Sequence, residues 1–373
     1  MIKTEYYKDL TKMNTFGMKV KARCFMEYDS VADLVDIEFE ELARPVLHIG
    51  GGSNLLFTDD FKGTVLHSKI DFMEVLEEGH SDRAERVEES VLVSVGSGVV
   101  FDDFCEWASK EGLWGVENLS YIPGEVGASA VQNIGAYGVE VKDVIHKVYC
   151  YDTVEEEFVS FGVEECEYGY RDSIFKNPEL KGRYIVTHVV FALSREPKPR
   201  LDYGHLAEAV KEAQSVRASE LTPSLIRKVI IKIRKDKLPE PSVVGSAGSF
   251  FKNPVITHEH FERIEAAAKA EHGADYKVPH YVIGNPESSS RHCEERSDVA
   301  ICSIKVPAAW MIEQCGWKGR RSGGAAVWDK QPLVIVNYTG EAFPEEIIGL
   351  ERRIISSVKQ KFGVELHPEV DHI

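Results

Sequence analysis

Apolar residues in the first half of the chain gather in short runs that are separated by glycine-rich turns. Such runs, rich in β-branched side chains and bounded by turn residues, predict β-strands. The predicted strands cover residues 45–49, 65–68, 73–77 and 91–95, with a further strand at 334–337. Residues 78–90 are charged and carry no core-forming pattern, so we expect a solvated hairpin tip there.

Three segments instead repeat apolar residues at the helical period and carry a helix start or stop signal. These signals are an N-cap followed by proline, a proline at the first position, or a glycine just after the last turn. The predicted helices cover residues 100–112, 222–239 and 344–363. Because strands and helices mix without a regular strand–helix–strand repeat, we predict an α+β fold rather than a doubly wound α/β fold.

The chain has 373 residues, which at about 150 residues per domain favours two or three compact units. Its 44 Lys and Arg against 61 Asp and Glu leave a net charge of −17, which argues against nucleic acid and anionic lipid as partners. The longest apolar runs, such as 189–193, are far shorter than the about 20 residues that span a bilayer, and residues 1–15 lack a signal-peptide pattern. We therefore expect a cytoplasmic protein with no membrane or nucleic-acid partner.

Seven cysteines are scattered along the chain without a CxxC pair, which indicates reduced thiols rather than a disulfide framework or a zinc site. Two of them lie in residues 284–303, a polar and serine-rich segment whose flanking sequences would fit together if joined directly. We expect a flexible surface insertion there. His292 and Cys293 within it lack the spaced second pair that a closed zinc site needs, so no metal site is predicted.

Two glycine-rich loops are the first candidates for ligand binding. The sequence has no P-loop and no GxGxxG, which disfavours a Rossmann nicotinamide or flavin site. Residues 50–54 (GGGSN) and 123–129 (PGEVGAS) can instead turn sharply and present successive backbone N–H groups to a pyrophosphate. Either loop alone is more readily a simple tight turn. The dense glycines and amides of residues 132–138 (QNIGAYG), directly after the second loop, favour the binding function.

Three further side chains are candidates for chemistry. Arg171 stands among small and polar residues and suits bidentate recognition of a carboxylate or phosphate, with a surface ion pair to Asp172 as the alternative. Ser249 stands between a glycine turn and an aromatic pair, so it is either a proton donor or only a turn residue. Glu369 lies where the chain ends, and because chain ends usually fray, a function there needs other support.

Taken together, these blocks resemble the bacterial UDP-N-acetylenolpyruvoylglucosamine reductases of peptidoglycan synthesis. The motif GYRDSIFK and the tyrosine in LDYG are similar to the subtype that keeps a substrate-closing tyrosine loop. The matching blocks, which run from the first twenty residues to the last five, are 14–17, 50–56, 117–119, 122–138, 169–176, 201–204, 237–239, 248–254, 323–327 and 368–370.

The resemblance implies three domains, two of which bind FAD in the non-Rossmann manner of the vanillyl-alcohol oxidase or PCMH-type flavoproteins. The expected boundaries are 1–72 for the first FAD-binding subdomain, with 345–373 returning to it or to the active site, then 73–220 for the second and 221–344 for the substrate-binding domain. It further implies that NADPH reduces FAD and that the reduced flavin passes a hydride to C3 of an enolpyruvyl UDP-sugar. A proton at C2 completes UDP-N-acetylmuramate, and a monomer is expected.

The same resemblance assigns roles to individual residues. Ser249 matches the proton donor, while Arg171 and Glu369 match the pair that stabilises the enolate form of the substrate carboxyl. The residues that match the sugar-nucleotide site are Tyr203, Lys237, Asn253 and Gln331. The residues expected to bind FAD are Gly50, Gly51, Gly52, Ser53, Asn54, Leu55, Pro123, Gly124, Gly127, Ala128, Ser129, Asn133, Gly135, Ala136, Tyr137 and Gly138.

The chain departs from the family pattern in three places. His367 stands where many relatives have an acid, Asp371 stands where relatives often place arginine, and residues 284–303 have no counterpart. Two alternative functions stay open: an FAD-dependent oxidase of the same fold, and a catalytically inactive module that binds flavin or a sugar nucleotide. Both are less favoured, because all three catalytic positions of the reductases are filled.

Overall fold

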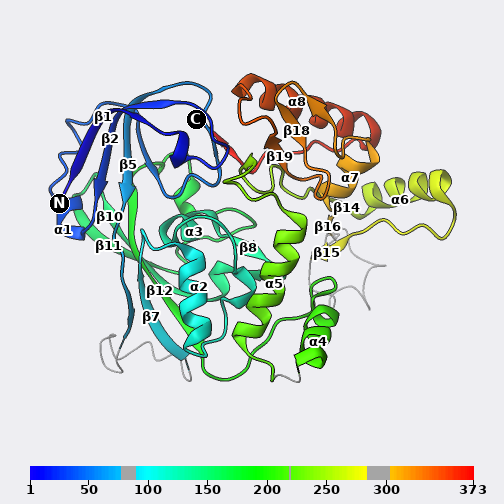
Figure 1. The fold of residues 1–373 in the computed structure, drawn as a ribbon, viewed down its shortest axis with the longest axis horizontal. Coiled ribbons are helices and arrows are strands. Elements are labelled where there is room, and N and C mark those ends of the chain that lie inside the picture. The colour runs from blue at the N-terminus through cyan, green and yellow to red at the C-terminus, as the bar shows by residue number, and fades with distance from the viewer. Residues whose placement is uncertain (77–89, 218–219, 284–302) are drawn as a thin grey trace, which may run out of the picture. The chain divides into compact units, whose positions relative to one another are not determined.

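The computed structural model describes residues 1–76, 90–217, 220–283 and 303–373 of the chain (Figure 1). They form two compact units. Unit 1 comprises residues 1–15, 19–53 and 59–237, and unit 2 comprises residues 16–18, 54–58 and 238–373. The predicted α+β class is confirmed, because helices are interspersed with mainly antiparallel sheets rather than with repeated strand–helix–strand units.

The first sheet of unit 1 has the strand order β1-β2-β5-β3. Strands β2 and β3 run parallel to β5, and β1 runs antiparallel to β2, which is followed by helix α1 (Val31–Val35). The predicted strands at 45–49 and 65–68 are β3 and the second half of β5. The bounds are β1 (Lys3–Asp9), β2 (Lys21–Tyr28), β3 (Val46–Ile49) and β5 (Phe61–Ser68).

The second sheet of unit 1 is antiparallel, with the order β11-β10-β12-β7-β6. Helix α2 (Phe101–Lys110) packs on it, with the buried rings of Phe104 and Phe191 4.6 Å apart. Gly112 follows this helix with a φ of 71°, which is the C-terminal position that the sequence predicts. The strand bounds are β6 (Met73–Val75), β7 (Ser90–Gly96), β10 (Ile145–Asp152), β11 (Glu157–Gly162) and β12 (Tyr184–Ser194).

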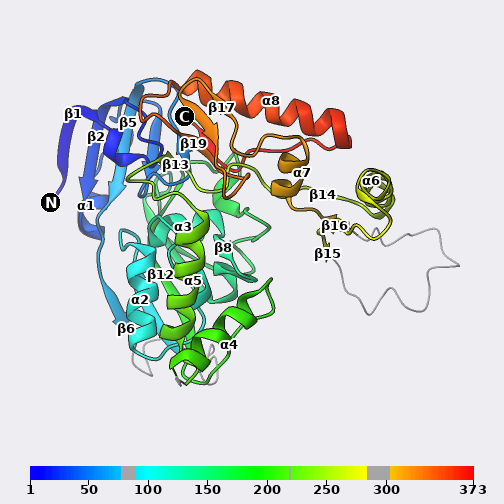
Figure 2. The ribbon, with the colours of Figure 1, turned by 45° about the vertical axis from the view of Figure 1, so that its right-hand side comes forward.

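Three more helices complete unit 1: α3 (Val126–Gln132), α4 (Leu206–Arg217) and α5 (Pro223–Lys237). Helix α5 lies beside α2 and α4 in both views (Figures 1 and 2), and Arg227 of α5 forms two hydrogen bonds to Asp102 of α2. Its start at Pro223 confirms the helix that the sequence predicts. The shorter elements are the hairpin strands β8 (Gly135–Ala136) and β9 (Val139–Glu140) and 3-10 turns at Thr11–Met13, Glu117–Leu119, Val141–Asp143 and Ile174–Lys176.

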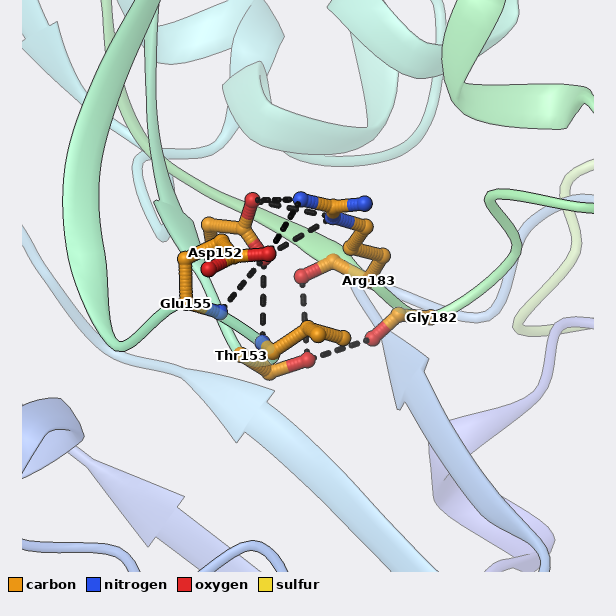
Figure 3. A network of polar contacts seen from close by, with 6 residues as sticks. Asp152, Thr153, Glu155, Gly182 and Arg183 are labelled. Atoms are coloured by element: carbon orange, nitrogen blue, oxygen red, sulfur yellow. Dashed lines mark hydrogen bonds and ion pairs between the residues drawn. The ribbon is translucent and has the colours of Figure 1, made fainter.

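A polar network joins the end of β10 to the start of β12 (Figure 3). Arg183 donates from Nε to both carboxylate oxygens of Asp152, at 3.0 and 2.9 Å, and from Nη2 to Oδ2 at 2.7 Å. The same carboxylate accepts the backbone N–H groups of Val154 and Glu155, and Thr153 donates to the Arg183 carbonyl. Because Asp152 is buried, these bonds satisfy a charge that would otherwise destabilise the sheet.

Unit 2 contains an antiparallel sheet of order β13-β19-β18-β17, against which helix α8 (Pro344–Phe362) packs. Glu346 in the first turn of α8 accepts the Phe343 N–H at 2.9 Å and the Gly324 N–H at 3.0 Å, and Gly363 ends the helix with a φ of 68°. The predicted helix at 344–363 and the predicted strand at 334–337 are thus confirmed. The strand bounds are β13 (Gly245–Ser246), β17 (Arg321–Ser322), β18 (Ala325–Val327) and β19 (Ile335–Asn337).

A second antiparallel sheet of unit 2, of order β14-β16-β15, packs against helix α6 (His258–His272). The predicted insertion at 284–303 lies outside the described residues except for Ser303, as do His292, Cys293 and the predicted hairpin tip up to residue 89. Within the described ranges, no helix is both long and apolar enough to cross a membrane. The remaining bounds are β14 (Val255–Thr257), β15 (Tyr281–Ile283), β16 (Ser303–Lys305), α7 (Ala308–Gln314), β4 (Leu55–Leu56) and β20 (Asp371–His372).

Candidate active site

The two glycine-rich loops meet in unit 1, although about seventy residues separate them in the sequence. Ser53 donates from Oγ to the Pro123 carbonyl at 3.0 Å, and a Cβ placed on Gly51 would lie 3.6 Å from the Gly124 Cα. Gly52 has a φ of 60°, and a Cβ there would lie only 2.0 Å from the Met13 carbonyl oxygen. Only glycine therefore fits this turn.

The loops offer backbone donors to a ligand. Across the described part of the chain, the N–H groups of Gly51, Gly52, Ser53, Gly124 and Glu125 donate to no backbone carbonyl. Successive unpaired amides in glycine-rich turns form a concave nest that binds the oxygens of a phosphate. The loops therefore fit the diphosphate of FAD through main-chain dipoles, and they need no basic side chain to do so.

Other residues of the predicted FAD set support these loops from within. A Cβ on Gly127 would lie 2.8 Å from the Ser97 Cβ, and a Cβ on Gly50 would lie 3.2 Å from the Ala128 Cβ. Ser129 is buried and donates from Oγ to the Val126 carbonyl, at 2.7 Å, inside α3. These side chains pack α3 against its neighbours, so any contact that the segment makes with a cofactor comes from its backbone.

Residues 133–138 form a second arm of the predicted FAD set. Asn133 ends α3 with a φ of 44°, and its side chain donates to Glu140 Oε2 at 3.0 Å and to the Gly169 carbonyl at 2.8 Å. Ala136 then pairs with Val139 across a two-residue hairpin turn in which Tyr137 and Gly138 both have positive φ, 49° and 78°. A left-handed tyrosine is strained, and such strain concentrates at functional sites.

Arg171 lies in a tight turn in which Gly169 and Asp172 exchange backbone hydrogen bonds at 3.0 and 3.2 Å. Its own φ of 56° is unusual for arginine. The guanidinium donates from Nη1 to the Asn133 carbonyl at 3.2 Å and from Nη2 to the Gly135 carbonyl at 2.6 Å. These two bonds attach Arg171 to residues 133–135 of the predicted FAD set.

Tyr203, the predicted substrate-closing tyrosine, belongs to the same neighbourhood of unit 1. Its side chain is 42% exposed, and its ring meets the Tyr137 ring edge-on, with centroids 6.0 Å apart. Lys237 is exposed at the last position of α5. Burial raises the pKa of Tyr137, against the opposing effect of the nearby Arg234 guanidinium, so this ring presents a neutral hydroxyl.

Ser249 and Glu369 are brought together in unit 2 by a short antiparallel pairing. Glu369 donates its backbone N–H to the Phe250 carbonyl at 2.8 Å, and Lys252 donates its backbone N–H to the His367 carbonyl at 2.9 Å. Ser249 is exposed and follows Gly248, whose φ is 68°, while Phe250 is fully buried behind it. The glycine turn thus places Ser249 directly before the residues that pair with the segment 367–369.

The C-terminal segment is anchored rather than frayed. Asn54 donates from Nδ2 to the Glu369 carbonyl at 3.0 Å, and Asp371 donates its N–H to the Asn54 carbonyl at 3.0 Å. Strand β20 then pairs in parallel with β4, and Thr58 holds the Ile373 carbonyl through both its N–H and its hydroxyl at 2.8 Å. Asn54 and Leu55, predicted with the FAD set, therefore lie in unit 2 and anchor the C-terminal segment, which contains Glu369 and strand β20.

The two remaining predicted substrate residues flank the Ser249 segment. Asn253 accepts the backbone N–H of Ala308, the first residue of α7, on Oδ1 at 2.9 Å. Gln331 accepts the Val334 N–H on its carbonyl at 3.0 Å in the turn before β19. Leu333 in that turn accepts the Phe250 N–H at 2.8 Å. Unit 2 therefore gathers Ser249, Asn253, Gln331 and Glu369.

Comparison with known proteins identifies the family. Residues 240–373 match the family described as UDP-N-acetylenolpyruvoylglucosamine reductase, C-terminal domain, and residues 23–159 match an FAD binding domain. The chain is 46% identical over 365 residues to the UDP-N-acetylenolpyruvoylglucosamine reductase of Bacteroides fragilis, with 98% of each chain covered. The chain belongs to the UDP-N-acetylenolpyruvoylglucosamine reductase family.

Other relatives agree with this family. The UDP-N-acetylenolpyruvoylglucosamine reductase of Porphyromonas gingivalis is 42% identical over 369 residues, covering 98% of this chain and 97% of its own. The solved UDP-N-acetylenolpyruvylglucosamine reductase of Thermus caldophilus has the same fold, with a TM-score of 0.61 at 21% identity over 100% and 98% of the two chains. The family resemblance and the FAD-binding domain expected from the sequence are thus confirmed, and the protein is an FAD-dependent oxidoreductase.

Two residues that contribute to this site, Asn118 and His67, are not among the site residues predicted from the sequence. Asn118 donates to the carbonyls of Tyr137 at 2.9 Å and Arg200 at 2.8 Å, and so ties the hairpin turn to the segment that leads to Tyr203. The carboxylate of Glu125, inside the second glycine loop, contacts His67. A polar Asn118 inside the matching block 117–119, within an apolar stretch, is a sequence signal that could have identified it as a site residue. No local sequence signal identifies His67.

Proposed function

We propose that the protein reduces UDP-N-acetyl-3-O-(1-carboxyvinyl)-glucosamine to UDP-N-acetylmuramate, with NADPH as the hydride donor, in the synthesis of peptidoglycan precursors. The observation that carries this proposal is the 46% identity over nearly the full length of the Bacteroides fragilis reductase, together with the filled positions Ser249, Arg171 and Glu369. The UDP-sugar is the small-molecule partner of this site.

FAD, once bound and reduced by NADPH, would supply the hydride that adds to C3 of the enolpyruvyl double bond. The proposed task of Ser249 is to deliver a proton from Oγ to C2. A serine hydroxyl is a weak acid, but it serves a strongly basic carbon centre when it is held at the right position. The glycine turn at Gly248 and the buried Phe250 support this role, because they anchor the backbone on both sides of Ser249 and leave its side chain exposed to a ligand.

Arg171 and Glu369 are proposed to act on the substrate carboxyl as negative charge develops on it. Arg171 supplies a positive charge in a fixed plane, because its guanidinium is already bonded to the carbonyls of Asn133 and Gly135. Glu369 helps as a hydrogen-bond donor, which requires its carboxyl to be protonated at the moment of reaction. Tyr203, Lys237, Asn253 and Gln331 are proposed to hold the sugar nucleotide, with Lys237 as a point charge for its diphosphate.

The FAD diphosphate is proposed to bind at the glycine loops of unit 1. Within the described residues, the N–H groups of these loops that donate to no backbone carbonyl support this placement; they belong to Gly51, Gly52, Ser53, Gly124 and Glu125. The domain division proposed from the family pattern is 1–72 with 345–373, 73–220 and 221–344.

Following the two half-reactions separately by flavin absorbance tests this function. In the Ser249→Ala variant we expect NADPH to bleach the flavin at the normal rate, while reoxidation by the enolpyruvyl UDP-sugar is lost. Ser246→Ala is the matched control, because it removes a hydroxyl three residues earlier that is buried in β13. Normal turnover of the Ser249→Ala variant would remove the serine from the proposal.

The same measurement separates the alternatives. Reoxidation of the reduced wild-type flavin by oxygen, with no response to the enolpyruvyl UDP-sugar, would indicate an oxidase of this fold. A flavin that NADPH does not reduce, in a protein that still binds the UDP-sugar, would indicate an inactive binding module. Either result contradicts the proposed reductase activity.

A further inference from the structure

A buried chain of ionisable side chains lies against the glycine loops in unit 1. His67, near the end of β5, is 3% exposed and contacts a carboxylate with each of its ring nitrogens. Its Nε2 lies 2.9 Å from Glu125 Oε1, and its Nδ1 lies 3.1 Å from Glu27 Oε1. Glu27 comes from β2, and Glu125 is the residue that immediately precedes α3.

Because a carboxylate lies against each ring nitrogen of His67, the surroundings favour the positively charged imidazolium. A neutral imidazole has one N–H, so it donates to one carboxylate and directs a lone pair at the other. The imidazolium donates to both, and it also balances one of the two negative charges in a buried site. Burial opposes the charged ring. The hydrogen bonds to Glu125 and Glu27 and the negative charge of Glu125 outweigh the effect of burial, so the pKa of His67 is raised above its ordinary value.

Glu125 connects this chain to the proposed cofactor site. It is 8% exposed, and its Oε2 lies 3.1 Å from where a Cβ on Gly50 would stand, so the carboxylate rests on the first residue of the other glycine loop. Its own backbone N–H is one of the unpaired amides of the nest. An uncompensated carboxylate at this place would repel the two negative charges of a diphosphate, and burial strengthens that repulsion.

We propose that His67 is a cofactor-positioning residue, whose imidazolium cancels the charge of Glu125 so that the two glycine loops accept the diphosphate of FAD. The inference rests on the proposed placement of that diphosphate at the loops. It makes FAD binding a proton-linked event: the phosphates favour the imidazolium further, so binding takes up protons, and the affinity is highest where His67 is charged.

The other ionisable groups around His67 do not change this assignment. Lys69, two residues beyond it, opposes the imidazolium. His48 on β3 shares a hydrogen bond of 2.7 Å with the Tyr28 hydroxyl. Burial lowers the pKa of His48 to about 4, so its ring is neutral near neutral pH. Burial raises the pKa of Tyr28, which is therefore also neutral. The raised pKa of His67 favours its imidazolium, whereas His48 and Tyr28 are neutral near neutral pH.

The decisive measurement is the dissociation constant of FAD from the apoprotein as a function of pH, read from the quenching of flavin fluorescence. For the wild-type protein we expect the constant to rise with pH by up to about tenfold per unit once the imidazolium loses its proton. Calorimetry in buffers with different ionisation enthalpies should show proton uptake on binding. A constant affinity between about pH 6 and about pH 9, with no proton uptake, overturns the inference.

Substitutions separate charge compensation from mere packing. In His67→Gln, the amide keeps one hydrogen bond but no charge, so we expect a dissociation constant that does not vary with pH and is about 10- to 100-fold above the wild-type value at low pH. Glu125→Gln removes the charge that needs compensation, so FAD should bind tightly at every pH. The double variant His67→Gln/Glu125→Gln should bind tightly again, which a purely structural role for His67 does not predict.

His48→Gln is the matched control, since it alters a half-buried neutral histidine on the adjacent strand and should keep the pH dependence. Where His67→Gln fails to fold, the wild-type profile and Glu125→Gln decide alone: a Glu125→Gln variant that retains the full pH dependence overturns the inference. Wild-type protein that binds FAD with a pH-independent affinity leaves the proposed function intact. Wild-type protein that does not bind FAD at all contradicts the proposed function instead.

Discussion

Replacing Arg171 with lysine tests whether the shape of this side chain matters beyond its charge. The guanidinium holds two carbonyls, of Asn133 at 3.2 Å and of Gly135 at 2.6 Å, in one plane. Lysine keeps the charge but presents a single flexible ammonium, so at least one of the two charged hydrogen bonds is lost. Such a bond contributes about 1.5–3 kcal/mol, and because Arg171 is only half-buried, the lower part of this range, about 1.5–2 kcal/mol, applies.

We expect this loss in the step in which the substrate carboxyl develops negative charge. A loss of about 1.5–2 kcal/mol corresponds to about a 10- to 30-fold slower reoxidation of the reduced flavin by the enolpyruvyl UDP-sugar. Stopped-flow absorbance measures this step directly. Reduction of the flavin by NADPH in the same variant should proceed at the wild-type rate, because the proposal gives Arg171 no part in it.

Arg183→Lys is the control, because it makes the same exchange at a bidentate arginine elsewhere in unit 1 (Figure 3). It should lower the melting temperature and leave both half-reactions unchanged. If Arg171→Lys reoxidises as fast as the wild-type protein, the planar two-carbonyl attachment has no catalytic consequence and the reasoning is refuted. If both variants slow reoxidation equally, the effect is one of general stability rather than of position.

Three further outcomes are expected. Asp152→Asn should lower the free energy of unfolding by about 2–3 kcal/mol in chemical denaturation near neutral pH. Burial opposes ionisation of Asp152, but its bonds to Arg183 hold its pKa below the ordinary value. The stability advantage of the wild-type protein should therefore vanish as the pH falls through that lowered pKa. Asn54→Ala should slow reoxidation about fivefold while the flavin content stays normal, because the bond to the Glu369 carbonyl contributes about 1 kcal/mol; loss of flavin would instead indicate a direct cofactor contact. Tyr203→Phe should weaken the apparent affinity for the UDP-sugar by about 3- to 10-fold without affecting flavin reduction, and an unchanged affinity would exclude the hydroxyl from the site.

Local patterns predicted the elements whose signals lie within a few residues. Helix α5 begins at Pro223 and α8 ends before Gly363, as their start and stop residues indicate. Strand β12 (Tyr184–Ser194) was not predicted, although it lies at the centre of its sheet. It is an almost unbroken apolar run, buried on both faces, so it shows no alternation that distinguishes a strand from a buried helix. Helix α6 was also missed, and its apolar face consists of little more than Phe261, Ile264 and Ala268.

The residues of the candidate site likewise fall into those that local sequence motifs predict and those that depend on long-range contacts. The left-handed glycines at 52, 124 and 138 follow from loops that only glycine can form, and motif matches bring in Arg171 and Ser249. The hydrogen bond between Asn54 and Glu369 joins residues 315 positions apart, and no spacing rule foresees it. The same holds for His67, which lies opposite Glu27 because β5 pairs with β2 and which contacts Glu125 from 58 positions away. Long-range pairing, rather than local propensity, decides such contacts.

The net charge of −17 and a set of anionic ligands are compatible because the two act at different ranges. Surface carboxylates are screened by water and salt within about 10 Å, whereas dipoles and charges in a buried loop act on a phosphate with little screening. The glycine loops contribute main-chain amides, which give a positive local field without adding a positive residue. Glu125 is the acidic residue that belongs to this loop, and in our proposal the His67 imidazolium, 2.9 Å away, compensates its charge. If the proposed site is correct, an acidic chain binds a diphosphate by compensating one buried carboxylate, and its overall charge has little influence on that site.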